Sequence, residues 1–300
     1  MAWHFERVAG PYEGGVGGVA WDGTAVIFAA VGEARLLSFD PATKAATEIR
    51  RYTNRTNGIA FGPERRLYGC QEGSRRVIQF LADGSATVTA TKLAGRHHNF
   101  PSDLTVARSG AIWFADPYNP MPAFGPQLFA PLDHASVLCL QRNGAHQWVL
   151  ERKSFDTAAP RAVLLSPDEK TLYVAEGDAG AATRELRAYP VGEDGRLGAF
   201  TVLHTFGRDH RGPHRGIEGM CLDADGNIVA CAGWRRSGPG PMLYVFSPSG
   251  AVLETHPLPD DLPQRCQFGG AGLDSLYLTT AGGHLLCAER TTRRGYDRFT

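Results

Sequence analysis

An apolar strand, a polar turn and a second apolar strand recur together six times along the chain. The copies start 40 to 59 residues apart, at Gly18 (GVAWDGTAVIFAA), Gly58 (GIAFGPERRLYGC), Asp103 (DLTVARSGAIWFAD), Ala162 (AVLLSPDEKTLYVAE), Gly219 (GMCLDADGNIVACA) and Cys266 (CQFGGAGLDSLYLTTA). Short apolar runs separated by Gly, Pro, Asp or Ser turns are typical of β-hairpins. Hairpins that return about every 40–50 residues indicate a β-propeller with one blade per repeat. The pattern therefore predicts an all-β fold with six blades.

Each repeat continues into further strands, so we expect four-stranded antiparallel blades. The third strands are predicted at residues 35–40, 77–81, 136–140, 186–189, 243–246 and 284–287. Few residues follow Cys287, and the last blade therefore lacks an outer strand of its own. We expect the N-terminal stretch Trp3–Val8 to supply it, which closes the ring and covers an exposed edge. Residues 1–300 are predicted to form a single domain.

Charge and composition exclude several classes of protein. The chain has 31 basic and 31 acidic residues, and neither a basic stripe nor a lysine-rich run suggests nucleic acid or a membrane surface as a partner. The first ten residues are charged and do not resemble a signal peptide, and no run of 18 apolar residues occurs. The six cysteines form no C-x-x-C pair, which indicates buried thiols in a reducing compartment. We expect a cytoplasmic monomer or homodimer that acts on a small molecule.

Longer phrases carry a resemblance to a known family. The region from Asn57 to Asp116 contains NGIAFGPERRLYGCQEGSRRV and then AGRHHNFPSDLTVARSGAIWFADP. It resembles the middle of the SMP-30/gluconolactonase/LRE-like family. The phrases SPDEKTLYVAE, GIEGMCLDADGNIVA and CQFGGAGLDSLYLTTA are similar to its fourth, fifth and sixth blades, so the resemblance covers essentially the whole chain.

This resemblance implies a six-bladed propeller with its site at one mouth of the central channel. Members of the family bind a divalent metal there, usually calcium or zinc, and many hydrolyse sugar lactones or related esters. The metal polarises the substrate carbonyl and activates water. By this resemblance we interpret the protein as a lactonase-like hydrolase.

The positions that correspond to the family's metal ligands carry different residues in this chain. They are Gly17, Ser102, Arg161 and Glu218, where the family has Glu, Asn, Asn and Asp. Arginine has no lone pair to offer a metal, and calcium requires six or more oxygen ligands. We therefore expect no metal cofactor and an Arg161–Glu218 pair at the mouth. A Ca, Zn or Mg ion held by Glu218, the best remaining ligand, is the alternative.

The resemblance places further polar residues near the same mouth. We predict catalytic roles for four residues, because they can carry charge or move a proton: Arg161, Glu218, Asp103 and His98. We predict substrate-binding roles for five others: Asn99, Ser102, Glu72, Asp116 and Tyr118. The proline-rich insertion Pro117–His134 is expected to form a wall of the site.

Loss of the family's ligand set leaves other functions open. A metal-free lyase, isomerase or condensing enzyme, as in the distantly similar strictosidine synthase, fits the same positions. A non-catalytic binder of a small molecule also fits them. Metal content and a panel of aldonolactones distinguish these alternatives.

Overall fold

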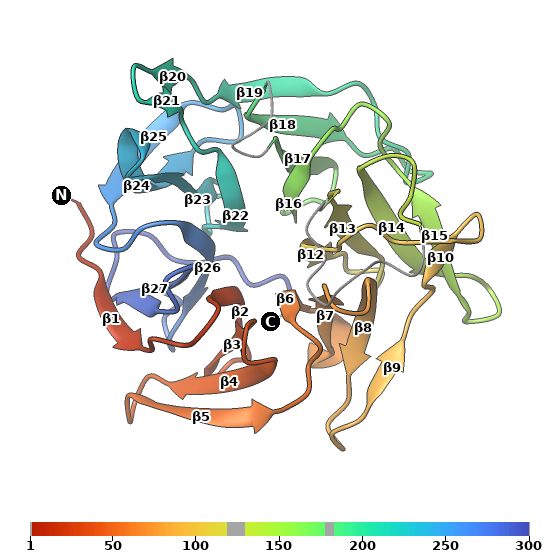
Figure 1. Ribbon diagram of the computed structural model, residues 1–300, viewed down its shortest axis with the longest axis horizontal. Helices are drawn as coiled ribbons and strands as arrows, with labels where there is room; N and C mark the ends of the chain where they lie inside the picture. The colour runs from red at the N-terminus through yellow and green to blue at the C-terminus, as the bar shows by residue number, and fades with distance from the viewer. Residues whose placement is uncertain (1, 119–129, 178–182, 300) are drawn as a thin grey trace.

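Six four-stranded antiparallel sheets surround a central channel (Figure 1), in a computed structural model that describes residues 2–118, 130–177 and 183–299. Each of the first five blades is a run of four consecutive strands. Blade one consists of β2 (Val16–Trp21), β3 (Val26–Ala30), β4 (Arg35–Asp40) and β5 (Ala45–Arg50), and blade two of β6 (Thr56–Phe61), β7 (Leu67–Gln71), β8 (Arg76–Phe80) and β9 (Ala86–Val88). Blade three consists of β12 (Asp103–Val106), β13 (Ile112–Asp116), β14 (Ser136–Arg142) and β15 (Trp148–Arg152), and blade four of β16 (Pro160–Leu165), β17 (Thr171–Glu176), β18 (Glu185–Pro190) and β19 (Thr201–Thr205). Blade five consists of β22 (Ile217–Leu222), β23 (Ile228–Trp234), β24 (Ser237–Phe246) and β25 (Val252–Pro257).

Blade six combines both ends of the chain. It consists of β26 (Pro263–Gly269), β27 (Ser275–Thr280) and β28 (Leu285–Ala288), with β1 (Glu6–Ala9) as its outer strand. Strand β1 pairs with β28 in antiparallel register, with Glu6 opposite Cys287. The predicted six-bladed fold and its closure by an N-terminal strand are thus confirmed.

The remaining elements are short. A 3-10 turn, η1 (Pro63–Arg65), joins the first two strands of blade two. Two small hairpins, β10 (Lys92–Leu93) with β11 (Arg96–His97) and β20 (Arg208–Asp209) with β21 (Gly212–Pro213), precede the inner strands of blades three and five. Nowhere in the described part of the chain is there a helix of the length and apolar character needed to cross a bilayer.

The hydrophobic core lies in the seams between neighbouring blades. Between blades five and six, Val229 and Leu243 pack with Phe268 and Leu276 in one buried cluster, which Trp3 extends. Similar clusters fill the seams between blades two and three and between blades three and four. Alternation along each strand sends its apolar side chains to the two faces of the blade, so each blade contributes to two seams.

Glycine at the first position of three repeats allows the inner strands to approach closely. A Cβ atom at Gly18 would lie 2.5 Å from the Asn57 carbonyl oxygen, and one at Gly58 would lie 2.7 Å from the Ser102 carbonyl oxygen. A Cβ atom at Gly219 would lie 2.5 Å from the Gln264 carbonyl oxygen. Larger side chains at these positions would force the blades apart around the channel mouth.

Candidate functional site

Six residues at the same position of the repeat surround one mouth of the channel. Each immediately precedes one of the six repeat starts, near the beginning of an innermost strand. They are Gly17, Asn57, Ser102, Arg161, Glu218 and Arg265. Neighbouring inner strands contact one another in the order β2, β6, β12, β16, β22, β26 and back to β2, so these residues follow one another around the mouth. We call this set the mouth ring.

Hydrogen bonds link several neighbours in the mouth ring. The Gly58 N–H donates to the Ser102 carbonyl (3.0 Å), and the Ser102 hydroxyl donates to the Arg161 carbonyl (3.1 Å). The Thr279 hydroxyl accepts from the Arg265 N–H (3.1 Å) and donates to the Gly17 carbonyl (2.6 Å). Gly17 itself leaves room for Asn57, whose Oδ1 occupies the space that a Cβ at Gly17 would fill.

Glu218 is an ionised carboxylate held by arginines. Its Oε2 accepts from Arg161 Nη2 (2.8 Å) and its Oε1 lies 3.2 Å from Arg215 Nη2, while Arg265 donates to its main-chain carbonyl. Burial alone would raise the pKa of Glu218, but the charges of Arg161 and Arg215 lower it to about 2. The Arg161 side chain is 30 % exposed, whereas those of Glu218 and Arg215 are buried. The predicted Arg161–Glu218 pair is present.

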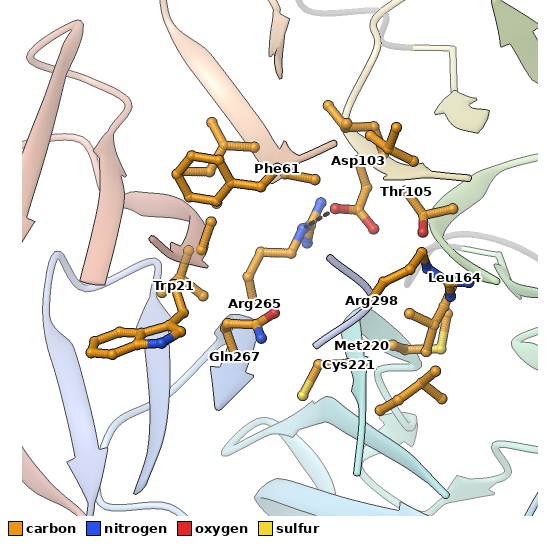
Figure 2. Close-up of a pocket in the computed structure, with 18 of the residues that line it drawn as sticks. Trp21, Phe61, Asp103, Thr105, Leu164, Met220, Cys221, Arg265, Gln267 and Arg298 are labelled. Carbon is orange, nitrogen blue, oxygen red and sulfur yellow. Dashed lines mark hydrogen bonds and ion pairs between the residues drawn. The ribbon is translucent and has the colours of Figure 1, made fainter. Parts of the chain in front are cut away.

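A second ion pair crosses the channel beneath the mouth. Arg265 Nε lies 2.9 Å from Asp103 Oδ1 (Figure 2), and Arg265 Nη2 donates to the Ser102 carbonyl at 3.2 Å. Burial raises the pKa of Asp103, and Arg265 opposes that rise. Asp103 Oδ2 also accepts from the Val163 N–H at 3.2 Å. Arg265 therefore connects Asp103, Ser102 and Glu218 in one hydrogen-bond network.

A cavity of about 160 Å³ adjoins the mouth ring on the side of blades one and two. Glu72, Asn57, Gln264 and Gly17 line it. Asn57 Nδ2 donates to Glu72 Oε1 at 2.7 Å, which orients this carboxylate. The cavity brings Glu72, a predicted substrate-binding residue, beside two members of the ring.

The residues at the family's metal position do not fit a divalent cation. Gly17 offers no side-chain ligand, and Ser102 offers only a neutral hydroxyl, which donates to the Arg161 carbonyl. Both oxygens of Glu218 face arginines, whose charge repels a metal ion. Within residues 2–118, 130–177 and 183–299, no group of three or more His, Cys, Asp or Glu side chains is arranged to hold a metal.

Three predicted site residues are enclosed behind the mouth. The imidazole of His98 is 0 % exposed and stacks on Phe114, and burial lowers the pKa of His98 to about 4. Asn99 donates through its side chain to the main-chain carbonyls of His134 (3.0 Å) and Asp116 (3.3 Å). Asp116 accepts from the Asn99 N–H at 2.8 Å, and burial raises the pKa of Asp116 to about 7.

Two other blades have a polar residue at the position of Asp116, and these residues make similar contacts. This similarity indicates that the enclosed residues stabilise the fold. Like Asp116 on β13, Gln71 and Glu176 end the second strands of their blades. Gln71 donates to the Thr53 carbonyl, and Glu176 accepts from the N–H groups of Ala158 and Ala159, so both hold the segment that leads into an inner strand. Asp116 holds the segment at Asn99 in the same way.

The predicted wall of the site is described only at its two ends. Residues 119–129 of the Pro117–His134 insertion lie outside the described residues. Tyr118 is 57 % exposed and lines a surface pocket together with His134 and Thr157. The substrate-binding role of Tyr118 and the wall stay predictions.

Sequence reasoning did not single out Arg265, Arg215 or Asn57. Two of them could have been found from the repeat. Arg265 and Asn57 immediately precede a repeat start, just as Arg161 does. Reading the same position in all six repeats would have identified the whole mouth ring. No pattern marks Arg215, whose position becomes apparent only through its 3.2 Å contact with Glu218.

The fold and the site define a six-bladed propeller with a polar, arginine-rich ring at one mouth of its channel. The family model described as SMP-30/Gluconolactonase/LRE-like region matches residues 17–282. The chain belongs to this family, which confirms the resemblance found in the sequence.

Similar proteins include several lactonases. A gluconolactonase of Zymomonas mobilis is 27 % identical over 80 % of this chain and 64 % of its own length. A 6-deoxy-6-sulfogluconolactonase of Pseudomonas putida is 26 % identical over 62 % of this chain and 56 % of its own. The chain thus spans less than two thirds of the length of these curated relatives. The solved structure of a gluconolactonase from Xanthomonas campestris is 28 % identical, with a TM-score of 0.73 over 95 % of this chain and 88 % of that one.

Proposed function

We propose that this protein hydrolyses a lactone or related cyclic ester of a small carbohydrate-derived molecule, without a metal ion. Membership of the family and the similarity to named gluconolactonases support the reaction class. The observation that carries the proposal is the Arg161 guanidinium, which stands at a metal-ligand position of the family, is partly exposed and is held by Glu218 at 2.8 Å.

In this proposal, the Arg161 guanidinium supplies the positive charge that a metal ion would otherwise supply. Hydrolysis of an ester places negative charge on the carbonyl oxygen, and fixed N–H donors lower the energy of that transition state. Glu218 fixes Arg161 through two contacts to Oε2, at 2.8 Å from Nη2 and 3.3 Å from Nε. Arg215 in turn fixes Glu218. The guanidinium is thereby oriented before a substrate arrives.

Glu72 is our candidate for the general base. A base must accept a proton near neutral pH, and the low pKa of Glu218 makes it a poor one. The enclosed ring of His98 has no access to a substrate in the mouth. Glu72 lines the cavity beside the mouth ring, where Asn57 Nδ2 donates to its Oε1 and Arg55 Nη2 lies 3.6 Å from its Oε2. We assign this oriented carboxylate the role of holding and deprotonating a water molecule.

The charges around the mouth favour a substrate that carries an anionic group. Three guanidinium groups, from Arg161, Arg215 and Arg265, accompany two carboxylates, from Glu218 and Asp103. These described groups carry three positive and two negative charges, and cationic groups at a mouth attract an anionic substrate. The name of the Pseudomonas putida relative, a sulfogluconolactonase, is consistent with a sulfonate- or carboxylate-bearing lactone.

The test is lactone hydrolysis by metal-stripped protein. The protein is treated with a chelator, dialysed and assayed by acid release on glucono-1,5-lactone and on glucarolactone, which carries a free carboxylate. We expect turnover above the uncatalysed rate, no change with the chelator and preference for the anionic substrate. Absence of turnover on the whole panel contradicts the hydrolase, and activity that returns only with added Ca²⁺ or Zn²⁺ contradicts the metal-independent site.

A further inference from the structure

Three cysteine side chains meet in the seam between blades five and six. Cys221 on β22 and Cys266 on β26 have their sulfur atoms 3.6 Å apart. Cys231 on β23 belongs to the same buried cluster. All three side chains belong to the buried cluster of this seam and are at most 4 % exposed. Neither the fold nor the proposed hydrolysis requires three thiols at one point.

Two of these thiols border a cavity inside the channel. The cavity, of about 140 Å³, is lined by Arg265, Asp103 and Cys221 (Figure 2). Cys266 and the C-terminal residues Tyr296–Phe299 also line it. A water molecule takes up about 30 Å³, so hydrogen peroxide fits in this space. Cys231 is not among the lining residues.

Their surroundings make the thiols chemically unequal. Hydrogen bonds from Cys221 and Cys231 lower the pKa of Cys266, whereas burial raises the pKa of both Cys221 and Cys231. The thiolate is the reactive form of cysteine. Cys266 lines the cavity and has the Cys221 thiol at contact distance, and this geometry together with its lowered pKa makes it the expected first site of oxidation.

We propose that Cys266 and Cys221 are a peroxide-sensitive pair that forms a disulfide between blades five and six. The Cys266 thiolate attacks hydrogen peroxide, the O–O bond breaks, and a sulfenic acid and hydroxide form. The Cys221 sulfur then attacks the sulfenyl sulfur and loses its proton, and the S–O bond breaks as water leaves. Two thiols and one peroxide thus give one disulfide and two waters.

This cross-link joins the two strands that carry the centre of the site. Strand β22 carries both Glu218 and Cys221, and β26 carries both Arg265 and Cys266. The sulfur atoms must approach by more than about 1 Å to bond, because a disulfide bond is much shorter than a van der Waals contact. Oxidation therefore ties β26, which carries Arg265, covalently to β22. The chemistry of the pair does not depend on the proposed hydrolysis.

The test is oxidation of the folded protein with hydrogen peroxide. Remaining thiols are counted in denaturant and the peptides are mapped by mass spectrometry without reduction. We expect four titratable cysteines instead of six and a Cys221–Cys266 peptide pair that dithiothreitol separates. Six remaining thiols, oxidation of Cys266 to sulfinic acid without a cross-link, or a disulfide that includes Cys231 would each overturn the proposal.

Serine variants provide the controls. Cys221→Ser removes the partner, so peroxide should leave no disulfide in this seam. Cys139→Ser is the matched control, because Cys139 is equally buried but belongs to the seam between blades three and four. It should still lose two thiols on oxidation. If Cys221→Ser does not fold, the peptide map of the unaltered protein still decides the question.

Discussion

Arg265 and Asp103 form a buried ion pair between opposite blades of the propeller, with Nε and Oδ1 2.9 Å apart (Figure 2). Blade six and blade three face each other across the ring, so this contact spans the channel. It separates the mouth from the cavity that Tyr296–Phe299 close at the other end. The pair therefore forms the floor of the candidate site.

We predict that Arg265→Met destabilises the protein by about 3–5 kcal/mol, because it leaves the buried Asp103 without its cation. The Ser102 and Glu218 carbonyls also lose a donor. Urea unfolding measures the change in the free energy of unfolding. The double variant Arg265→Met/Asp103→Asn should recover part of the loss, since it removes the uncompensated charge but keeps an acceptor for Val163. Equal losses in both variants would contradict this explanation.

The sequence repeat predicts most of the fold because the strands of one blade are close together in the sequence. Hairpins and third strands are determined by alternation and turn residues within a few tens of positions, and β4 begins and ends at the predicted residues. Blade five differs, since its third strand β24 begins at Ser237, six residues before the predicted start. The Gly- and Pro-rich composition of residues 233–241 indicates a loop, yet Trp234 pairs with Ser237 beyond a bulge.

The site is only partly predictable because its contacts join distant blades. Arg161 and Glu218 were recognised from a local resemblance, and they are indeed 2.8 Å apart. Arg265 and Asp103 are separated by 162 residues, and only closure of the ring brings them together. The resemblance places His98 near the mouth, whereas its ring packs on Phe114 inside the protein.

The second prediction concerns turnover at Arg161. If this guanidinium stabilises the transition state, Arg161→Gln should lower kcat by about a hundredfold or more. The fold should persist, because Glu218 keeps its contacts with Arg215 and Arg265. Steady-state kinetics on the best lactone and urea unfolding give the two values. A variant that loses stability but keeps turnover within a few-fold would show that Arg161 only fills the position of a metal.

The third prediction is a pH dependence of stability that arises from Asp116. Burial raises the pKa of Asp116 from 3.8 to about 7, so the folded protein keeps a proton that the unfolded chain has released. Stability from this group is therefore fully present below pH 3.8 and falls as the pH rises towards 7. A change of this size corresponds to about 4 kcal/mol.

Asp116→Asn imitates the protonated carboxyl and should remove this part of the pH dependence. Above pH 7 the variant should be about 2–4 kcal/mol more stable than the unaltered protein, and near pH 4 the two should be similar. Urea unfolding at several pH values measures the difference. Glu193→Gln, at an exposed position, is the control and should leave the curve unchanged. Parallel curves for Asp116→Asn and the unaltered protein would rule out Asp116 as the source.

The last prediction concerns the C-terminal segment that closes the channel opposite the mouth. Arg298 anchors it to blade four, where its guanidinium donates to Glu169 Oε1 (2.8 Å) and to the carbonyls of Leu165 (2.7 Å) and Ser166 (3.1 Å). Its side chain is 8 % exposed, so Arg298→Ala leaves buried acceptors without donors and should cost about 2–3 kcal/mol.

Loss of this anchor should also open the channel cavity. A small thiol-directed reagent should then label Cys221 several-fold faster in Arg298→Ala than in the unaltered protein, because Cys221 and Arg298 line the same cavity. Labelling of Cys139, which lies in another seam, should not change and distinguishes local opening from general unfolding. Arg290→Ala, at an exposed position of the same terminal region, should affect neither rate nor stability. If both cysteines are labelled faster to the same extent, the segment contributes to stability without acting as a closure, and the cavity is reached only through global unfolding.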